Sequence, residues 1–156
     1  MSAETFKRIC ELLEKNKIAY KLFEHPPVHT SEEAARVRGV SMESGAKAMI
    51  VRSEGKFYEF VLAAHKRLDL DAVKRILKTK SASLASVDEV KSVTDCVPGS
   101  VPPFGNVFGI PVYADSSLAL TLNFNVGLLE KSIQMSLNDW KRIVNPREDS
   151  FSKSER

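Results

Sequence analysis

Residues 96–106, CVPGSVPPFGN, place three prolines and two glycines within eleven positions. Proline fixes φ and has no amide hydrogen, so this stretch cannot lie inside a helix or supply the donors of a central strand. It therefore predicts a loop with a fixed path. Glycine in such a loop either satisfies a turn that needs positive φ or leaves an amide that can donate to a carbonyl or an oxyanion. Both interpretations stay open for Gly99 and Gly105, and for Gly127 further along the chain.

Lys47 is a second candidate for chemistry, because it stands between small residues in GAKAMIV at the start of an apolar run. On an ordinary strand such a lysine is a solvated charge. Small neighbours would instead let a ligand approach, and the ammonium would supply a point charge to a phosphate or ester oxygen. Asn125, in FNVG, is similarly either a turn residue or a donor into a pocket.

The usual catalytic motifs are missing from the sequence. His25, His29 and His65 have no metal-ligand spacing, and no GxSxG motif accompanies them. Cys10 and Cys96 form neither a CxxC pair nor a zinc-finger pattern, and Cys96 fits a small buried side chain better than a nucleophile. The sequence therefore predicts no metal site, no cofactor and no Ser-His-Asp triad.

The composition indicates one domain that works inside the cell. A chain of 156 residues with 43% hydrophobic content can bury one substantial core. Its net charge of +3 excludes a histone-like polycation but allows a local basic face for a transient nucleic-acid contact. Neither a signal peptide nor a membrane span is apparent, and no disulfide framework is expected. We therefore expect a cytoplasmic protein without a membrane partner.

The hydrophobic periodicity predicts short helices and strands that alternate along the chain. Helices are expected over residues 3–16, 31–38, 72–77, 86–93 and 138–144, and strands over 18–23, 46–52, 56–64, 112–114, 121–124 and 132–136. The two longest strands flank a hairpin loop at residues 53–55. This order predicts an α/β (α+β) domain over residues 1–144, with a mixed central sheet surrounded by short helices. The polar residues 145–156 are expected to form a disordered tail.

An ordered set of segments carries a resemblance to a known family. These segments are SGAKAMIVR, FVLAAHKRLDLDAVKRIL, VPGSVPPFG, IPVYADSSL and FNVGLLEKSIQMSLNDW. From about Phe6 to Ile143 they resemble the YbaK/prolyl-tRNA synthetase insertion-like editing domain, in the order of that family. The resemblance implies a compact YbaK-like domain and an aminoacyl-tRNA deacylase that removes a wrong amino acid from a charged tRNA.

The resemblance also implies roles for individual residues. Lys47 matches a strand lysine that contacts the charged 3′ end, and the loop from Gly99 to Pro103 matches a Gly-x-x-x-Pro loop whose glycine amide holds the ester. Lys47, Gly99 and Ser100 are thus the expected catalytic residues. The expected substrate-binding residues are Tyr20, Thr30, Ala48, Val101, Pro102, Pro103, Asn125, Gly127 and Ser132. Members of the family that act on cysteine esters carry an aspartate where this sequence has Ser132, which argues against cysteine as the substrate.

The leading hypothesis is a free-standing deacylase that acts in trans on the 3′ CCA end of a tRNA carrying alanine, serine, threonine or cysteine. A synthetase or a translation factor complex is a further expected partner. One alternative, suggested by Ser132, is a tRNA-binding adaptor that has kept the fold but lost hydrolysis. Another is a small-molecule ester hydrolase or an amino-acid-binding protein that needs no tRNA. An aminoacyl ester is already activated, so the deacylase hypothesis requires neither a metal nor a strong nucleophile.

Overall fold

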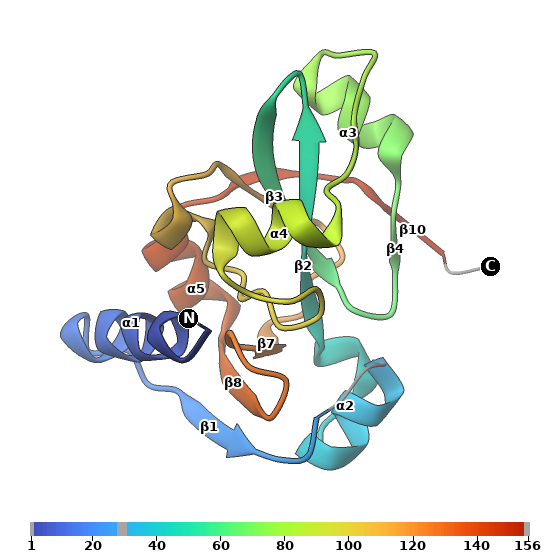
Figure 1. Ribbon diagram of the computed structural model, residues 1–156. Helices are drawn as coiled ribbons and strands as arrows, with labels where there is room; N and C mark the ends of the chain where they lie inside the picture. Colours follow the sequence, from blue (N-terminus) through green and yellow to red (C-terminus); the bar gives the residue numbers. More distant parts are fainter. Residues whose placement is uncertain (1, 28–30, 155–156) are drawn as a thin grey trace.

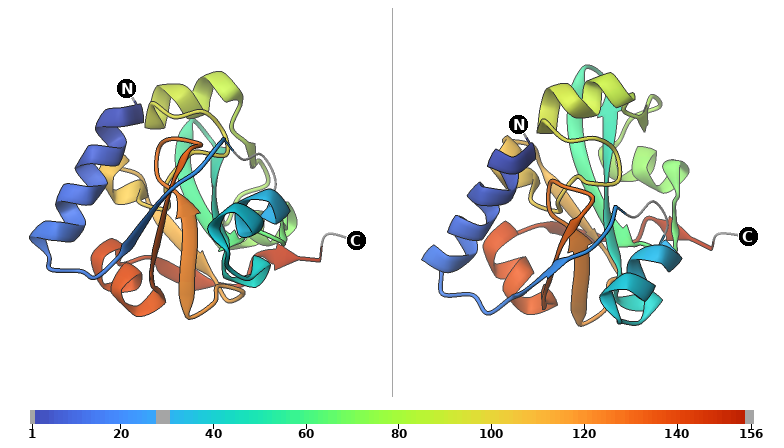
Figure 2. Two further views of the ribbon diagram at one scale, coloured as in Figure 1. Left: turned by 90° about the horizontal axis from the view of Figure 1, so that it is seen from below. Right: turned by 60° about the horizontal axis from the view of Figure 1, so that its bottom comes forward.

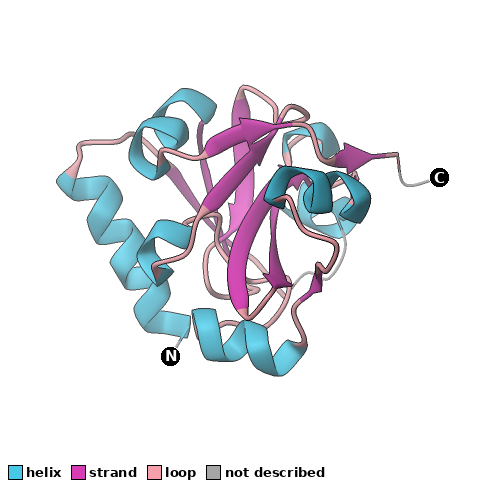
Figure 3. Ribbon diagram, turned by 90° about the horizontal axis from the view of Figure 1, so that it is seen from above, coloured by secondary structure: helices cyan, strands magenta, loops and turns pink. Residues whose placement is uncertain are grey.

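The computed structural model describes residues 2–27 and 31–154, and its helices surround a set of strands (Figures 1 and 3). The helices are α1 (Ser2–Lys15), α2 (Ser31–Arg38), η1 (Met42–Ser44), α3 (Leu70–Leu77), α4 (Val87–Thr94), η2 (Gly105–Phe108) and α5 (Leu137–Val144). The strands are β1 (Lys21–Glu24), β2 (Ala46–Ser53), β3 (Lys56–Ala63), β4 (Arg67–Leu68), β5 (Ser83–Leu84), β6 (Val112–Asp115), β7 (Thr121–Asn125), β8 (Lys131–Ser136), β9 (Arg147–Asp149) and β10 (Ser152–Lys153).

The central sheet has the order β5-β2-β3-β6-β9 and is mixed, because β3 pairs with β6, and β6 with β9, in parallel. A second, antiparallel sheet has the order β1-β8-β7, and β10 pairs with β4. The predicted hairpin is confirmed: Ser53 pairs with Lys56, and the two turn residues Glu54 and Gly55 both have positive φ, at 51° and 77°. Such a turn matches the right-handed twist of the strands that it joins. The predicted α/β fold with a mixed central sheet is thus confirmed.

Strand β1 begins three residues later than the strand predicted over residues 18–23. Lys17 adopts a left-handed conformation with φ 56°, and the amide of Ile18 donates to the carbonyl of Leu13 over 2.9 Å. These contacts close the carbonyl end of α1. Ile18 therefore belongs to the cap of the helix, and its buried side chain packs in the core without being part of a strand.

The hydrophobic core lies on both faces of the central sheet. On one face, α1 and α5 pack against the two sheets, and the largest buried side chain there is Trp140. Figure 2 shows α1 and the segment leading into β1 along the outer side of this face. On the other face, Ala72 and Val73 of α3 cover Phe60 and Leu62 of β3. No helix among the described residues is long and apolar enough to cross a membrane.

The prediction of a disordered tail is wrong for the residues that the structure describes. Strand β9 extends the central sheet, and the Phe151 ring meets the Phe60 ring edge-on with centroids 4.9 Å apart. Phe151 is only 1% exposed. The Asp115 carboxylate accepts the amides of Phe151 and Ser152 over 2.6 and 3.1 Å, and that of Ser117 over 2.9 Å. Burial alone would raise the pKa of Asp115, but these donors hold it below its usual value. One apolar ring and one buried carboxylate therefore order a segment whose composition is polar.

Candidate functional site

The proline-rich loop begins with a tight turn whose backbone conformation favours glycine. Gly99 has φ +93° and is exposed. A side chain there would be strained by this backbone conformation, although its Cβ would meet only Leu129, at 3.6 Å. Ser100 closes the turn, because its amide and its hydroxyl both donate to the carbonyl of Val97, over 3.1 and 2.8 Å.

Two residues near the end of β7, Asn125 and Gly127, donate hydrogen bonds to this turn. Asn125 donates from Nδ2 to the carbonyl of Gly99 over 2.7 Å, and the Gly127 amide donates to the carbonyl of Ser100 over 2.7 Å. The peptide that joins Gly99 to Ser100 is therefore bonded at both its carbonyl and its amide. The Gly99 amide lies on the preceding peptide, and within the described residues no acceptor takes it up. The turn thus leaves the amide of an exposed residue next to a peptide that is bonded at both ends.

A hydrogen-bonded series of side chains continues from Asn125. Ser132 is fully buried and donates from Oγ to Asn125 Oδ1 over 3.0 Å. His25 Nε2 lies 2.7 Å from the same Oγ, and His25 Nδ1 lies 2.8 Å from the carbonyl of Pro26. A carbonyl can only accept, so Nδ1 carries a hydrogen. This series connects the half-buried His25 to the Gly99 turn. His25 and Ser132 are 107 positions apart in the sequence, and Ser132 and Asn125 are 7 positions apart.

The far end of the loop is anchored in the core. Trp140 donates from Nε1 to the carbonyl of Pro103 over 2.8 Å, and the Gly105 amide donates to Glu59 Oε1 over 2.9 Å. A Cβ on Gly105 would lie 2.7 Å from Val112 Cγ2, so a larger residue cannot occupy this position unless the Val112 side chain moves. The prolines therefore connect an exposed turn to a buried anchor.

Glu59, which receives the Gly105 amide, is 0% exposed. Burial raises the pKa of Glu59 to about 8, although the amide of Gly105 opposes the rise. Its second oxygen, Oε2, has no hydrogen-bond partner among the described residues. The carboxyl is consequently neutral at pH 7, as expected for an acid that has no cation beside it in the core.

An apolar pocket of about 310 Å³ lies between the edge of β2, the start of α4 and the Gly99 turn. The turn contributes Pro98, Gly99 and Val101, and β2 contributes Ala48. Ala48, Gly99 and Val101, three of the residues that the resemblance implied, thus come together around one cavity.

Lys47 leaves β2 on the other face of the strand. Register pairs Lys47 with Leu62 of the α3-covered core and Ala48 with Val61 of the opposite core. Since side chains alternate along a strand, Lys47 and Ala48 point to opposite sides of the same edge.

Other predicted residues have positions that differ from the expectation. The Ser100 hydroxyl and amide serve the turn, and Pro102 and Pro103 are buried with it, so these three residues shape the loop. The Tyr20 hydroxyl donates to Glu14 of α1 over 3.1 Å, and burial raises the pKa of Tyr20. Thr30 lies outside the described residues.

Sequence reasoning missed His25 as part of this site, since it tested the histidines only for metal and triad patterns. The residue follows β1, and β1 pairs with β8, which carries Ser132. Only this long-range pairing brings the two side chains together. No local sequence motif predicts the contact between His25 and Ser132.

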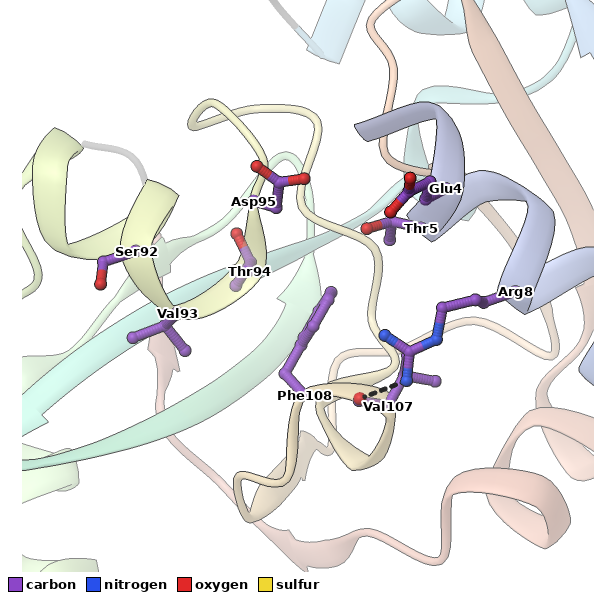
Figure 4. A pocket seen from close by; sticks show the side chains of 9 residues that line it. All are labelled: Glu4, Thr5, Arg8, Ser92, Val93, Thr94, Asp95, Val107 and Phe108. Carbon is purple, nitrogen blue, oxygen red and sulfur yellow. Dashed lines mark hydrogen bonds between the residues drawn. The ribbon is translucent and has the colours of Figure 1, made fainter. Parts of the chain in front are cut away.

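A second cavity of about 310 Å³ lies where α1, the end of α4 and η2 meet (Figure 4). Its lining is polar, and Arg8 donates across it from Nη2 to the carbonyl of Val107 over 2.9 Å. None of the residues selected from the sequence lines this cavity. The described residues also contain no group of three or more His, Cys, Asp or Glu side chains that could hold a metal ion.

Comparison with known proteins decides the family. The family described as "Aminoacyl-tRNA editing domain" matches residues 25–143. The chain belongs to this family. This editing domain is 30% identical to the multifunctional Ser/Thr-tRNA deacylase ProXp-y of Escherichia coli (strain K12), in an alignment that covers 96% of the chain and 94% of that protein.

The editing domain is also similar to part of a ligase and to a solved structure. It is 32% identical to the proline–tRNA ligase of Macrococcus caseolyticus over 67% of the chain, which is only 18% of the ligase. The fold matches the crystal structure of a candidate trans-editing enzyme for prolyl tRNA synthetase with a TM-score of 0.85. That match has 22% identity and covers 96% of this chain and 98% of the other, so it supports the fold alone.

Proposed function

We propose that this editing domain is a trans-acting aminoacyl-tRNA deacylase, which hydrolyses the ester between a small amino acid and the 3′ end of a mischarged tRNA. The observation that carries the proposal is the near full-length likeness to a free-standing deacylase, against a match to only 18% of a ligase. Alanine, serine, threonine and cysteine remain the candidate amino acids. Serine and threonine have the most support among them, because the relative is named a Ser/Thr-tRNA deacylase.

The chemistry requires a donor for the ester carbonyl and a positioned water or ribose hydroxyl. An ester oxygen becomes negative as the tetrahedral intermediate forms, and a rigidly held amide stabilises that charge without reorganising. The Gly99 amide supplies such a donor, because Asn125 and Ser100 fix the peptide that follows it. In this proposal Gly99 touches the substrate, whereas Asn125, Gly127 and Ser132 position the turn.

Lys47 supplies the positive charge for the terminal phosphate or ribose of the tRNA. Lys47 directly precedes Ala48 in β2, and Ala48 lines the pocket beside Gly99. An ammonium on one side of the edge and the Gly99 amide on the other would hold the two ends of an aminoacyl-adenosine. The protein would meet charged tRNA in the cytoplasm, alone or recruited to a synthetase or translation factor complex.

The test is deacylation of tRNAs charged with alanine, serine, threonine, cysteine or proline. We expect the wild type to release one or two of these amino acids rapidly, and Lys47→Ala to lose that activity while keeping its thermal unfolding transition. Lys56→Ala is the matched control, since this exposed lysine lies at the start of β3, beside the hairpin turn.

Two results would contradict the proposal. If a folded Lys47→Ala variant keeps full activity, Lys47 has no role in the reaction. If the wild type binds tRNA saturably but releases none of the five amino acids, the protein is the tRNA-binding adaptor. A small-molecule esterase would instead hydrolyse amino-acid esters equally well without tRNA.

A further inference from the structure

The edge of β2 beside the pocket has main-chain groups that the neighbouring strands do not use. Ser53 and Lys56 flank the two-residue turn, so the odd-numbered residues of β2 hydrogen-bond to β3 and the even-numbered ones face the other edge. Strand β5 takes up the C-terminal part of that edge, and the bond next to it runs from the Ala85 amide to the Ile50 carbonyl over 2.9 Å. Just before β2, Gly45 forms an isolated bridge with Asn123 of β7. Ala48 lies between these two contacts and directs its N–H and C=O away from β3.

The walls of the pocket are apolar and partly open to solvent. Besides Ala48, they include Ala85 and Val90, with Leu84 and Val87 at the mouth. Leu84 is 47% exposed and Val87 is 63% exposed, which is unusual for large aliphatic side chains. The volume of about 310 Å³ is at the lower end of the range for small-molecule sites, which combine apolar walls with a few polar groups. The Ala48 amide and carbonyl provide such polar groups.

We propose that this pocket binds the base of the terminal adenosine of the charged tRNA, a proposal that rests on the deacylase function above. A purine has two apolar faces, which suit the walls formed by Ala85, Val87 and Val90. Adenine presents its N6 amino donor beside the N7 acceptor, a pair that one acceptor and one donor lying side by side can recognise with two hydrogen bonds. The N–H and C=O of Ala48 point the same way from the strand edge and offer the complementary acceptor and donor.

The position of the pocket fits the reach of one nucleotide. The base and the aminoacyl ester belong to the same terminal adenosine, so their binding groups must be close together. Gly99 satisfies this requirement, because it lines the pocket and also carries the amide assigned to the ester. The base would thereby be held on one side of the turn while the ester meets the Gly99 amide.

Titration of the ¹⁵N-labelled protein with adenosine monophosphate tests the proposal without relying on hydrolysis. We expect saturable shifts of the Ala48, Ala85 and Gly99 amide signals, and much weaker shifts with uridine monophosphate. Ala85→Phe fills the pocket and should abolish the shifts of Ala48 and Gly99. The control is Ser83→Phe, an exposed residue of β5 that does not line the pocket.

The kinetics of deacylation provide a second test of the proposal. Ala85→Phe should raise the KM for charged tRNA about tenfold and leave kcat nearly unchanged, because it removes binding of the base and not of the ester. Val87→Ser, at a mostly exposed position that tolerates substitution, should weaken adenosine monophosphate binding severalfold even if Ala85→Phe fails to fold.

Three outcomes would overturn the inference. Adenosine monophosphate causes no shift around Ala48, or uridine monophosphate binds equally well, or Ala85→Phe changes which amino acid is released without changing KM. The last outcome would make the pocket a side-chain site. If the wild type releases no amino acid from any charged tRNA, the deacylase proposal fails, whereas the nucleotide titration still reports on the pocket.

Discussion

Replacing Glu59 with glutamine should make the domain more stable at neutral pH and remove the pH dependence that Glu59 contributes between pH 5 and 7.5. The folded protein holds the Glu59 proton until about pH 8, whereas the exposed carboxyl of the unfolded chain loses it near its ordinary value of 4.5. Between these values the folded state binds more protons than the unfolded state. The free energy of unfolding of the wild type therefore falls as pH rises through this window.

The size of the effect follows from the same two pKa values. Each pH unit inside the window costs the wild type about 1.4 kcal/mol, so the 2.5 units from pH 5 to pH 7.5 cost about 3 kcal/mol. Glutamine keeps an oxygen for the Gly105 amide and has no proton to lose. Glu59→Gln should thus match the wild type near pH 5 and exceed its stability by about 3 kcal/mol at pH 7.5.

Urea unfolding of both proteins at half-unit steps of pH measures this difference, and all other titrating groups cancel when the two curves are subtracted. The reasoning is refuted if the difference stays constant with pH, or if the wild type gains stability relative to Glu59→Gln as pH rises. Glu59→Asp is a useful companion, because it keeps the acid but shortens the reach to Gly105.

Three further variants probe the turn and the C-terminal segment. Gly99→Ala should cost about 1 kcal/mol of stability, because alanine is strained at positive φ, and should lower deacylation at least tenfold by tilting the amide. Asn125→Ala removes the bond to the Gly99 carbonyl and the acceptor for Ser132; we expect a loss of about 1–3 kcal/mol in urea unfolding and slower deacylation at unchanged amino-acid preference. Asp115→Asn should cost a similar 1–3 kcal/mol and expose the segment around Phe151 to proteolysis, and a variant as protease-resistant as the wild type would contradict the role of this carboxylate.

Local chemistry made much of the fold predictable. The Ser86 capping box was visible as a serine three residues before Glu89, and the structure forms both of its hydrogen bonds. Gly55 in the 53–55 loop likewise indicated a hairpin. The C-terminal segment could not be predicted in this way, because its order depends on one ring, Phe151, that finds Phe60 across the chain. A single apolar residue in a polar stretch creates no hydrophobic periodicity from which a helix or strand could be predicted.

The site was predictable in part. Composition alone required the proline-rich loop to have a fixed path, and its anchors at Trp140 and Glu59 explain how the path is held. The partners of the turn could not be read from the sequence, since Asn125 and Gly99 are 26 positions apart and meet only through the packing of β7 against the loop. For the same reason the hydrogen bond between His25 and Ser132 had no local signature.

The margins of the central sheet bear on how the protein behaves when it is concentrated. Its outermost strands, β5 and β9, contain two and three residues, and β9 consists of arginine, glutamate and aspartate with exposed side chains. Strands so short are poor templates for another chain, which would have to pair along an edge to begin an aggregate, and the charges of β9 make it a still poorer one. The short stretch of unpaired edge at Ala48 lies beside the proline-rich turn. Concentrated samples should consequently resist the edge-to-edge association that open sheets invite.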